Sequence, residues 1–274
     1  MAPLVVAICA DKGGVGKSTT TANIAAEAAL RGRRVLAIDA DKQADLTQLL
    51  GAEPQPGIGC DVIFTQWPTP AAAEFIRPVR ERLDLLGSWP SLTKADHELG
   101  ARARREYVLE TALADVLDDY ELIVLDVGHS AVIKDNVLAI ANVLLIPTTP
   151  SHLDVVHLIN MIEEADGRRA QLRLPPLRTP GRLVISLMRR SANSGMESTI
   201  MDKLREEYAA VLAPSVIPFT TRVQEAAFLG QTVREFRDQY ARGRTRDYKA
   251  LHQAVDAYST LTDHVLGLRR ARAA

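Results

Sequence analysis

Cysteine, net charge and long apolar runs are all scarce in this chain, and each scarcity excludes a class of protein. Its two cysteines, Cys9 and Cys60, do not have the spacing of metal ligands. The formal net charge is only −1, so overall charge does not attract the chain to nucleic acid, and any such binding must come from a local patch. No apolar run reaches the roughly 18 residues of a membrane span and no signal peptide is evident, so we expect a cytoplasmic protein.

What the chain does contain is a glycine-rich loop between an apolar run and an Ala-rich segment. Residues 4–9 are continuously apolar, which favours a strand buried on both faces, and residues 19–30 favour a helix. The loop between them consists of Lys12, Gly13, Gly14, Val15, Gly16, Lys17, Ser18 and Thr19. Its backbone N–H groups would surround a di- or triphosphate, Lys17 would neutralise the β- and γ-phosphates, and Ser18 would ligate Mg²⁺.

Lys12 is a second lysine in a loop that already has one. The ordinary pattern has glycine five residues before Gly16, where this chain has Asp11, and Lys12 follows it. Burying an extra cation there without a purpose would be costly. We expect Lys12 to reach a nucleotide held by a second copy of the chain, which predicts an ATP-dependent homodimer.

Apolar strand candidates alternate with helical stretches along most of the chain. After the first strand they lie at residues 35–38, 83–86, 122–125, 143–146, 183–187 and 216–217. This alternation predicts an α/β fold, with a mostly parallel, doubly wound sheet, helices on both faces, and ligands beyond the carboxyl ends of the strands. We expect a single domain over residues 1–274, with a long loop at about 51–80 and a C-terminal helix at about 245–268.

Two of these strands end in carboxylates, as nucleotide hydrolysis requires. The strand at 122–125 is followed by Asp126, the expected position of a Walker B carboxylate that holds Mg²⁺. The strand at 35–38 is followed by Asp39 and Asp41, which we expect to support the metal shell and to orient an attacking water, respectively. A single aspartate at a strand end can merely cap a helix, but two such strands beside a phosphate-binding loop favour a functional site.

Two further motifs accompany the loop. Residues 39–47 read Asp-Ala-Asp-Lys-Gln-Ala-Asp-Leu-Thr, and far downstream come Ile217-Pro218, Arg222, Glu225-Ala226 and Gly230. The first is similar to the motif D-x-D-P-Q-G-N-A-T, and the second matches I-P-x-x-x-R-x-x-E-A-x-x-x-G at every fixed position. With the additional lysine, they resemble the ParA/MinD group of P-loop ATPases, and ParA/Soj partition ATPases most of all. The resemblance spans almost the whole chain and is looser over residues 51–105.

The resemblance implies a role for each motif residue. The signature lysine would be Lys12, the phosphate lysine Lys17, and the switch I residue needed for hydrolysis Asp41. Ser18, Asp39 and Asp126 would form the Mg²⁺ site. The nucleotide-binding residues would be those of the loop, from Lys12 to Thr19, together with Pro218.

The resemblance also implies a cycle. Proteins of this group form an ATP sandwich dimer that binds double-stranded DNA without sequence specificity, until a ParB-type partner stimulates hydrolysis and releases them. ATP and Mg²⁺ are therefore the expected cofactors, and segregation of a plasmid or chromosome by a nucleoid-associated protein is the expected function.

Both switch segments depart from the pattern of the group. Lys42 replaces the usual proline and Asp45 the usual asparagine in switch I. After Asp126 the group has D-x-P-P, whereas this chain has Gly128 and His129 in place of the two prolines. We expect a more flexible switch II and slow ATP turnover, with His129 as a further candidate for a part in hydrolysis.

The DNA-binding surface is expected among arginines. Arg222 occupies a family position associated with DNA contact, and Arg190 is near a second one. Arg242, Arg244 and Arg246 alternate around Gly243, where they can contact phosphate oxygens without reading bases. Each alone is typical of a solvated surface charge, but together they predict a basic patch whose DNA binding weakens steeply with salt.

Other functions remain open at this stage. A MinD-like ATPase bound to membrane needs an amphipathic C-terminal helix, of which Leu266 and Leu268 supply only a trace, so no membrane is expected. A relative that positions a different cargo on the nucleoid would carry the same motifs. A binding role without hydrolysis is also open, because switch II departs from the pattern. An iron–sulfur reductase is set aside, since Cys9 and Cys60 are misplaced for a cluster.

Overall fold

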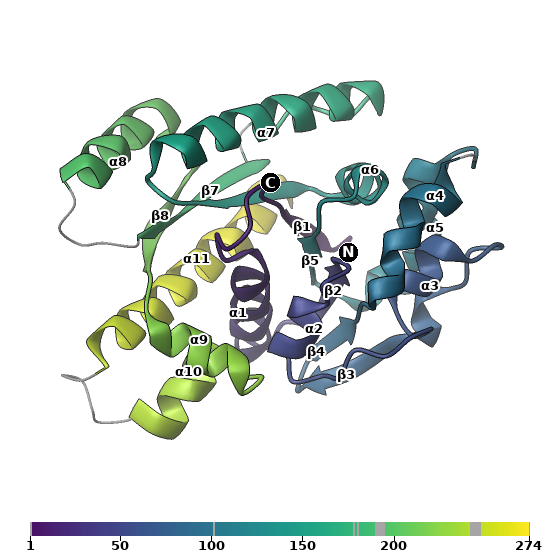
Figure 1. Cartoon of the computed structure of the whole chain (residues 1–274), viewed down its shortest axis with the longest axis horizontal. Helices are drawn as coiled ribbons and strands as arrows, with labels where there is room; N and C mark the ends of the chain where they lie inside the picture. The colour runs from purple at the N-terminus through teal and green to yellow at the C-terminus, as the bar shows by residue number, and fades with distance from the viewer. Residues whose placement is uncertain are drawn as a thin grey trace.

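The computed structural model of the chain describes residues 2–100, 102–177, 179, 181–189, 195–241 and 248–273, and centres on one eight-stranded sheet. Its strands are β1 (Leu4–Ile8), β2 (Val35–Ala40), β3 (Ile76–Arg80), β4 (Leu83–Leu86), β5 (Leu122–Val127), β6 (Val143–Thr148), β7 (Leu183–Arg189) and β8 (Leu212–Pro218). They lie in the order β3-β4-β2-β5-β1-β6-β7-β8 (Figure 1). Every pair is parallel except β3 with β4.

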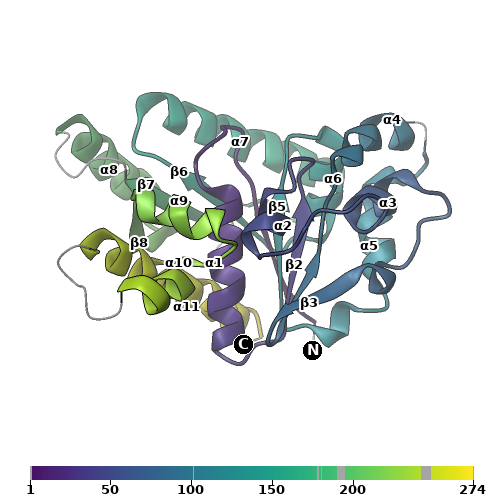
Figure 2. The same cartoon turned by 60° about the horizontal axis from the view of Figure 1, so that its bottom comes forward.

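Helices cover both faces of this sheet, as the alternation of segments predicts (Figures 1 and 2). One face carries α1 (Lys17–Leu30), α2 (Asp45–Leu49), α9 (Thr221–Phe228), α10 (Val233–Phe236) and α11 (Lys249–Ala273). The other carries α3 (Cys60–Thr65), α4 (Ala95–Leu99), α5 (Val108–Leu113), α6 (Ala131–Ile140), α7 (His152–Gln171) and α8 (Gly195–Tyr208). Short turns of helix complete the chain: η1 (Ala72–Glu74), η2 (Pro90–Lys94), η3 (Arg105–Tyr107), η4 (Leu117–Asp119) and η5 (Arg237–Ala241).

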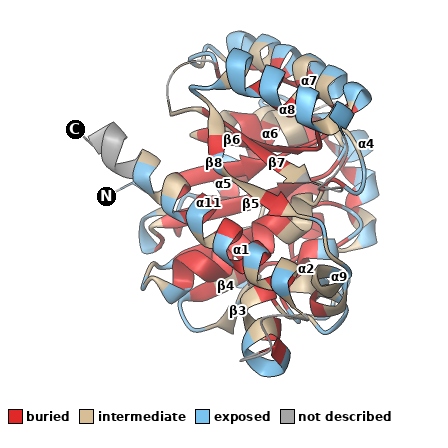
Figure 3. Ribbon diagram, turned by 90° about the vertical axis from the view of Figure 1, so that its left-hand side faces the viewer, coloured by how far each residue is buried: buried red, intermediate tan, exposed pale blue. Residues whose placement is uncertain are grey.

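The apolar run at the start of the chain forms a strand because both of its faces are buried. Val5 and Ala7 pack in the core beneath α3 to α8, while Val6 and Ile8 pack in the core beneath α1 and α11. Side chains alternate across a strand, so a strand between two helical layers must be apolar at every position. Figure 3 shows the result, with buried residues along the strands and exposed residues on the outer sides of the helices.

The expected loop at about 51–80 contains a short helix, α3, but it also ends in an edge strand that the sequence does not predict. Strand β3 pairs antiparallel with β4, and its sequence Ile-Arg-Pro-Val-Arg lacks an apolar alternation. Proline and arginine are typical of an edge strand, because they discourage pairing with a further strand. The last helix is described from Lys249 to Ala273, so it runs past the expected end at 268, whereas residues 245–247 of the expected helix lie outside the described residues.

Strands β2 and β5 both run further than expected, and this places the site. Asp39 lies within β2 and Asp126 within β5, and the two are paired across the neighbouring strands. They therefore stand side by side at the carboxyl edge of the sheet, next to the end of β1. Among the described residues, no helix has the length and apolar composition that crossing a bilayer requires.

Candidate nucleotide site

The glycine loop lies at the carboxyl edge of the sheet, between the end of β1 and the start of α1. Gly16 precedes α1 in the left-handed conformation, with φ +84°, and a Cβ there would lie 2.8 Å from Met188 Cε. The backbone angle favours glycine, and a Cβ would also force the flexible end of Met188 to move. A cavity of about 480 Å³ opens above the loop, large enough for a nucleotide.

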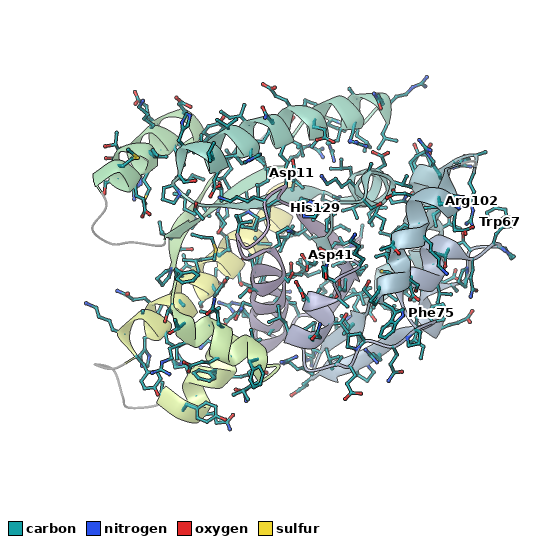
Figure 4. The ribbon with its side chains drawn as sticks, in the orientation of Figure 1. Asp11, Asp41, Trp67, Phe75, Arg102 and His129 are labelled. Atoms are coloured by element: carbon teal, nitrogen blue, oxygen red, sulfur yellow. The ribbon has the colours of Figure 1, made fainter. Side chains whose placement is uncertain are left out.

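Most of the predicted phosphate-binding residues line this cavity together with switch I. Its lining consists of Gly13, Gly14, Gly16, Lys17, Ser18, Thr19, Asp41, Lys42, Gln43, Asp45, Gln48, Leu49, His129 and Ala227. Val15 is instead buried beneath the loop, and Pro218 ends β8 outside this lining. Figure 4 shows Asp41 and His129 near each other beside the start of α1, with Asp11 close by and Trp67 and Arg102 far away.

Lys12 points away from the nucleotide cavity and binds a carboxylate of its own subunit. Its ammonium forms an ion pair with Asp154, a buried residue in the first turn of α7. The hydroxyl of Thr149 also donates to Asp154. Burial pushes the pKa of Asp154 up, but these hydrogen bonds and the charge of Lys12 outweigh it, so the net pKa lies below its ordinary value. Lys12 is thus held beside the nucleotide cavity by Asp154 and does not line the cavity of its own subunit.

Asp11, which replaces the first glycine of the ordinary loop, has a partner as well. Lys134 of α6 forms an ion pair with it at 2.6 Å, and both side chains are partly buried. This pair cancels a negative charge that would otherwise repel phosphate from the loop. The two residues before Gly13 therefore tie the loop to α6 and α7, the helices that follow β5 and β6.

Asp39 and Asp126 form a buried acidic pair beneath the loop. The carboxylate of Asp39 accepts from Thr47 Oγ1 at 2.6 Å and from the N–H groups of Thr47 and Asp41, so it orders switch I. Burial raises its pKa to about 7. Burial also raises the pKa of Asp126 well above its ordinary value, and the neighbouring Asp39 adds to the rise.

The unpartnered oxygens of Asp126 fit a magnesium ion. Among the described residues, neither oxygen has a hydrogen-bond partner of good geometry, although Asp126 is fully buried. Such a group is costly unless a ligand satisfies it, and Ser18 and Lys17 lie close enough to lower its pKa. No three His, Cys, Asp or Glu of the described residues gather into a metal site of their own. This suits Mg²⁺, which takes one or two carboxylates and completes its shell with phosphate oxygens and water.

Asp126→Asn should therefore stabilise the nucleotide-free protein while weakening its use of Mg²⁺. A carboxyl whose pKa is raised by folding loses stability as pH rises from the unfolded value, about 4, toward the folded one. The variant should unfold at a higher temperature than the parent chain, by a margin that is larger at about pH 8 than at about pH 5. In the same variant, Mg²⁺ should no longer strengthen ADP binding. A lower unfolding temperature at both pH values would contradict this account.

Switch I and switch II touch each other at Asp41 and Gly128. Asp41 is buried and its carboxylate accepts from the N–H of Gln43, while the N–H of Gly128 donates to the carbonyl of Ala40. A Cβ at Gly128 would lie 2.9 Å from Asp41 Cγ and 3.1 Å from its Cα. The glycine that replaces the first proline thus gives room to the expected hydrolytic residue.

Gly128→Ala should displace Asp41 and lower ATP turnover by about 100-fold, the cost of moving a reacting group by about 1 Å. ADP binding should change little, because the loop itself is untouched. Gly167→Ala is the matched control, since a Cβ at this helical position in α7 would meet nothing within 4 Å. Steady-state ATP hydrolysis and ADP titration check the prediction, and equal turnover in the Gly128→Ala and Gly167→Ala variants would refute it.

The structure places only one of the five predicted DNA-contacting arginines. Arg222 lies in the first turn of α9, paired with Glu225 at 2.6 Å and stacked over the ring of Tyr248 at 4.8 Å. The other four, Arg190, Arg242, Arg244 and Arg246, lie outside the described residues. Arg222 is held by these contacts, so it must exchange the Glu225 pair for a phosphate in order to bind DNA.

Two residues of the site are not among those predicted from the sequence. Asp154 and Lys134 hold the loop residues Lys12 and Asp11. Asp154 lies in the segment that follows the end of β6 at Thr148, and that position after a strand is the one signal that identifies it as a candidate. Lys134 has no local signal, because its partner Asp11 lies 123 positions away in the chain.

Comparisons with known proteins match a large part of the chain. The family model AAA_31, an AAA domain, matches residues 4–173. The chromosome partitioning protein ParA of Caulobacter vibrioides is 30% identical over 234 residues, covering 84% of this chain and 85% of that protein.

Two solved structures show the same fold over nearly the whole chain. Cobyrinic acid a,c-diamide synthase from Mycobacterium smegmatis, with bound ADP and magnesium, has a TM-score of 0.77 and 22% identity, covering 98% of this chain and 96% of that one. Apo McdA of Cyanothece has a TM-score of 0.76 and 20% identity, covering 94% of this chain and 98% of that one. At these identities the likeness concerns the fold alone.

Proposed function

Because the chain belongs to the AAA domain family AAA_31 and to the ParA/MinD-type P-loop ATPases, we propose that it is an ATP-driven partition protein. It binds ATP with Mg²⁺, forms a dimer in that state, and hydrolyses ATP slowly. The dimer binds double-stranded DNA without sequence specificity, and a ParB-type partner stimulates hydrolysis and releases it. Such a cycle would move a plasmid or chromosome over the nucleoid.

The position of Lys12 is the observation that carries this proposal. The side chain lies outside the cavity of its own subunit, held by Asp154, and it is 39% exposed. A cation in that position suits a triphosphate that comes from another subunit. Exchange of Asp154 for a partner's phosphates would then make dimerisation depend on ATP.

Exposed apolar side chains around the same edge support a dimer interface. Leu153 follows β6, Met196 follows β7 and Phe219 follows β8, and each is at least 49% exposed. Phe228, 90% exposed, comes directly after the cavity-lining residue Ala227. Large exposed apolar side chains are typical of interaction sites, and a face that bears the loop suits a second copy with its own loop opposite.

Within this dimer the chain's own residues divide the work of hydrolysis. Lys17 and the N–H groups of the loop hold the phosphates, and Ser18 and Asp126 would hold Mg²⁺, which supplies charge neutralisation at the phosphates. Asp41, fixed by the contact with Gly128, orients the attacking water. The water oxygen bonds to the γ-phosphorus as the bond to the bridging oxygen breaks, and ADP leaves with that oxygen.

ATP turnover tests the proposal against a role in binding alone. The purified chain should hydrolyse ATP slowly, and duplex DNA of unrelated sequences together with a ParB-type partner should raise the rate. Lys17→Ala should abolish ATP hydrolysis, and this loss would assign the activity to this site. If the chain binds ATP but hydrolyses none under any of these conditions, the proposed ATPase cycle is wrong and the chain has a role in nucleotide binding alone.

A further inference from the structure

The departures of this chain from the ParA/MinD pattern meet at one place in the structure. Lys42 stands in switch I where proline is usual, and Gly128 and His129 stand in switch II where two prolines are usual. Lys42 and His129 line the nucleotide cavity opposite the glycine loop. Both also line a second cavity of about 210 Å³ behind it, between the two switches and α4.

Neither of these two side chains has a partner among the residues that the structure describes. Within the described part of the chain, Lys42 and His129 make no hydrogen bond or ion pair, and both are exposed. Lys12 and Lys134, in contrast, are each held by an aspartate. Lys42 and His129 are therefore free to bind a ligand, and because they border both cavities they have room to turn toward either one.

Charge and position favour a phosphate as that ligand. The glycine loop and Lys17 hold the phosphates that lie deepest, so the terminal phosphate of ATP faces the switches. Two nitrogen donors, one from each switch, would meet it there. The carboxylates that face them are Asp41 and Asp45 of switch I and Asp96 of α4, and Asp96 already accepts from Ser130 Oγ at 2.7 Å.

We propose that Lys42 and His129 together bind the terminal phosphate of ATP and so make the site distinguish ATP from ADP. This proposal rests on the proposed function and concerns the same cavity. ADP has no group at that position, so the pair would stay unliganded in the ADP state. In the ATP state the shared phosphate would draw switch I and switch II together around Asp41, which already contacts Gly128.

Binding measurements separate this role from a structural one. ADP and the non-hydrolysable analogue AMPPNP are titrated by calorimetry, with Mg²⁺ present, into the full chain and its variants. Lys42→Met and His129→Asn should each weaken AMPPNP binding by about 10-fold, the effect of one lost charge-assisted hydrogen bond, and leave ADP binding unchanged. Lys42→Arg should retain the preference for AMPPNP, because it keeps the charge.

Lys94→Met is the matched control, an exposed lysine of η2 that lines neither cavity, and it should change neither affinity. If Lys42→Met and His129→Asn lowered the affinities for ADP and AMPPNP equally, or lowered neither affinity, the proposal would be overturned. Equal binding of the two nucleotides by the parent chain would overturn it too. A parent chain that binds no nucleotide at all would instead refute the proposed function.

Discussion

Lys12→Ala is expected to abolish ATP-dependent dimerisation and to lower ATP turnover by about 1,000-fold, the effect of removing a cationic finger supplied in trans. ADP binding should be retained, because Lys12 lies outside the cavity of its own subunit. A lysine that served its own nucleotide would give the opposite pattern, with ADP affinity lost first. Light scattering in ATP and in ADP, together with ADP titration, distinguishes the two.

Asp154 provides the companion variant. In the free subunit its buried carboxylate holds Lys12. Asp154→Asn removes the charge but keeps a similar shape, so Lys12 should leave more readily and dimerisation should need less ATP. If Lys12→Ala still dimerised in ATP and turned it over at the parent rate, the assignment of Lys12 to the neighbouring subunit would be wrong.

Asp41→Ala is expected to trap the ATP state. Loss of a group that orients the attacking water typically costs about 100- to 10,000-fold in rate. Asp41 is not among the phosphate ligands, so ATP binding, dimerisation and DNA binding should persist and even be prolonged. The expected result is a variant that stays dimeric and DNA-bound in ATP for as long as the parent chain does in AMPPNP.

The matched control for this variant is Asp115→Ala, which removes an exposed carboxylate that does not line the cavity. It should turn over ATP at the parent rate. Hydrolysis is followed by phosphate release and the dimer by light scattering. If Asp41→Ala hydrolysed ATP normally, the attacking water would have to be oriented by another group, and the contact between Asp41 and Gly128 would have no catalytic meaning.

Much of the fold and the centre of the site follow from local sequence. Apolar runs that are buried on both faces can be predicted as strands. The loop before Thr19 can be predicted because glycine and lysine stand at fixed spacings. Strand β3 could not be predicted from the sequence, because its pairing with β4 depends on the partner strand and not on its own arginines and proline.

The supports of the site depend on contacts between distant residues, which a single sequence does not reveal. Lys12 and Asp154 are 142 positions apart, and Asp11 and Lys134 are 123 apart. The sequence predicts a more flexible switch II, because Gly128 stands where the pattern has proline, and the structure adds that this glycine leaves room for Asp41. The same residue thus has a packing reason that only its neighbour in space supplies.

The most direct test of the account is the oligomeric state and DNA affinity of the chain in ADP, in ATP and in AMPPNP. Size-exclusion chromatography with light scattering is paired with gel shifts on duplex DNA of two unrelated sequences, at low and at high salt. We predict a monomer without DNA affinity in ADP, and in AMPPNP a dimer that binds both DNAs alike and weakens steeply with salt. The same oligomeric state and the same DNA affinity in all three nucleotides would contradict a nucleotide-gated dimer.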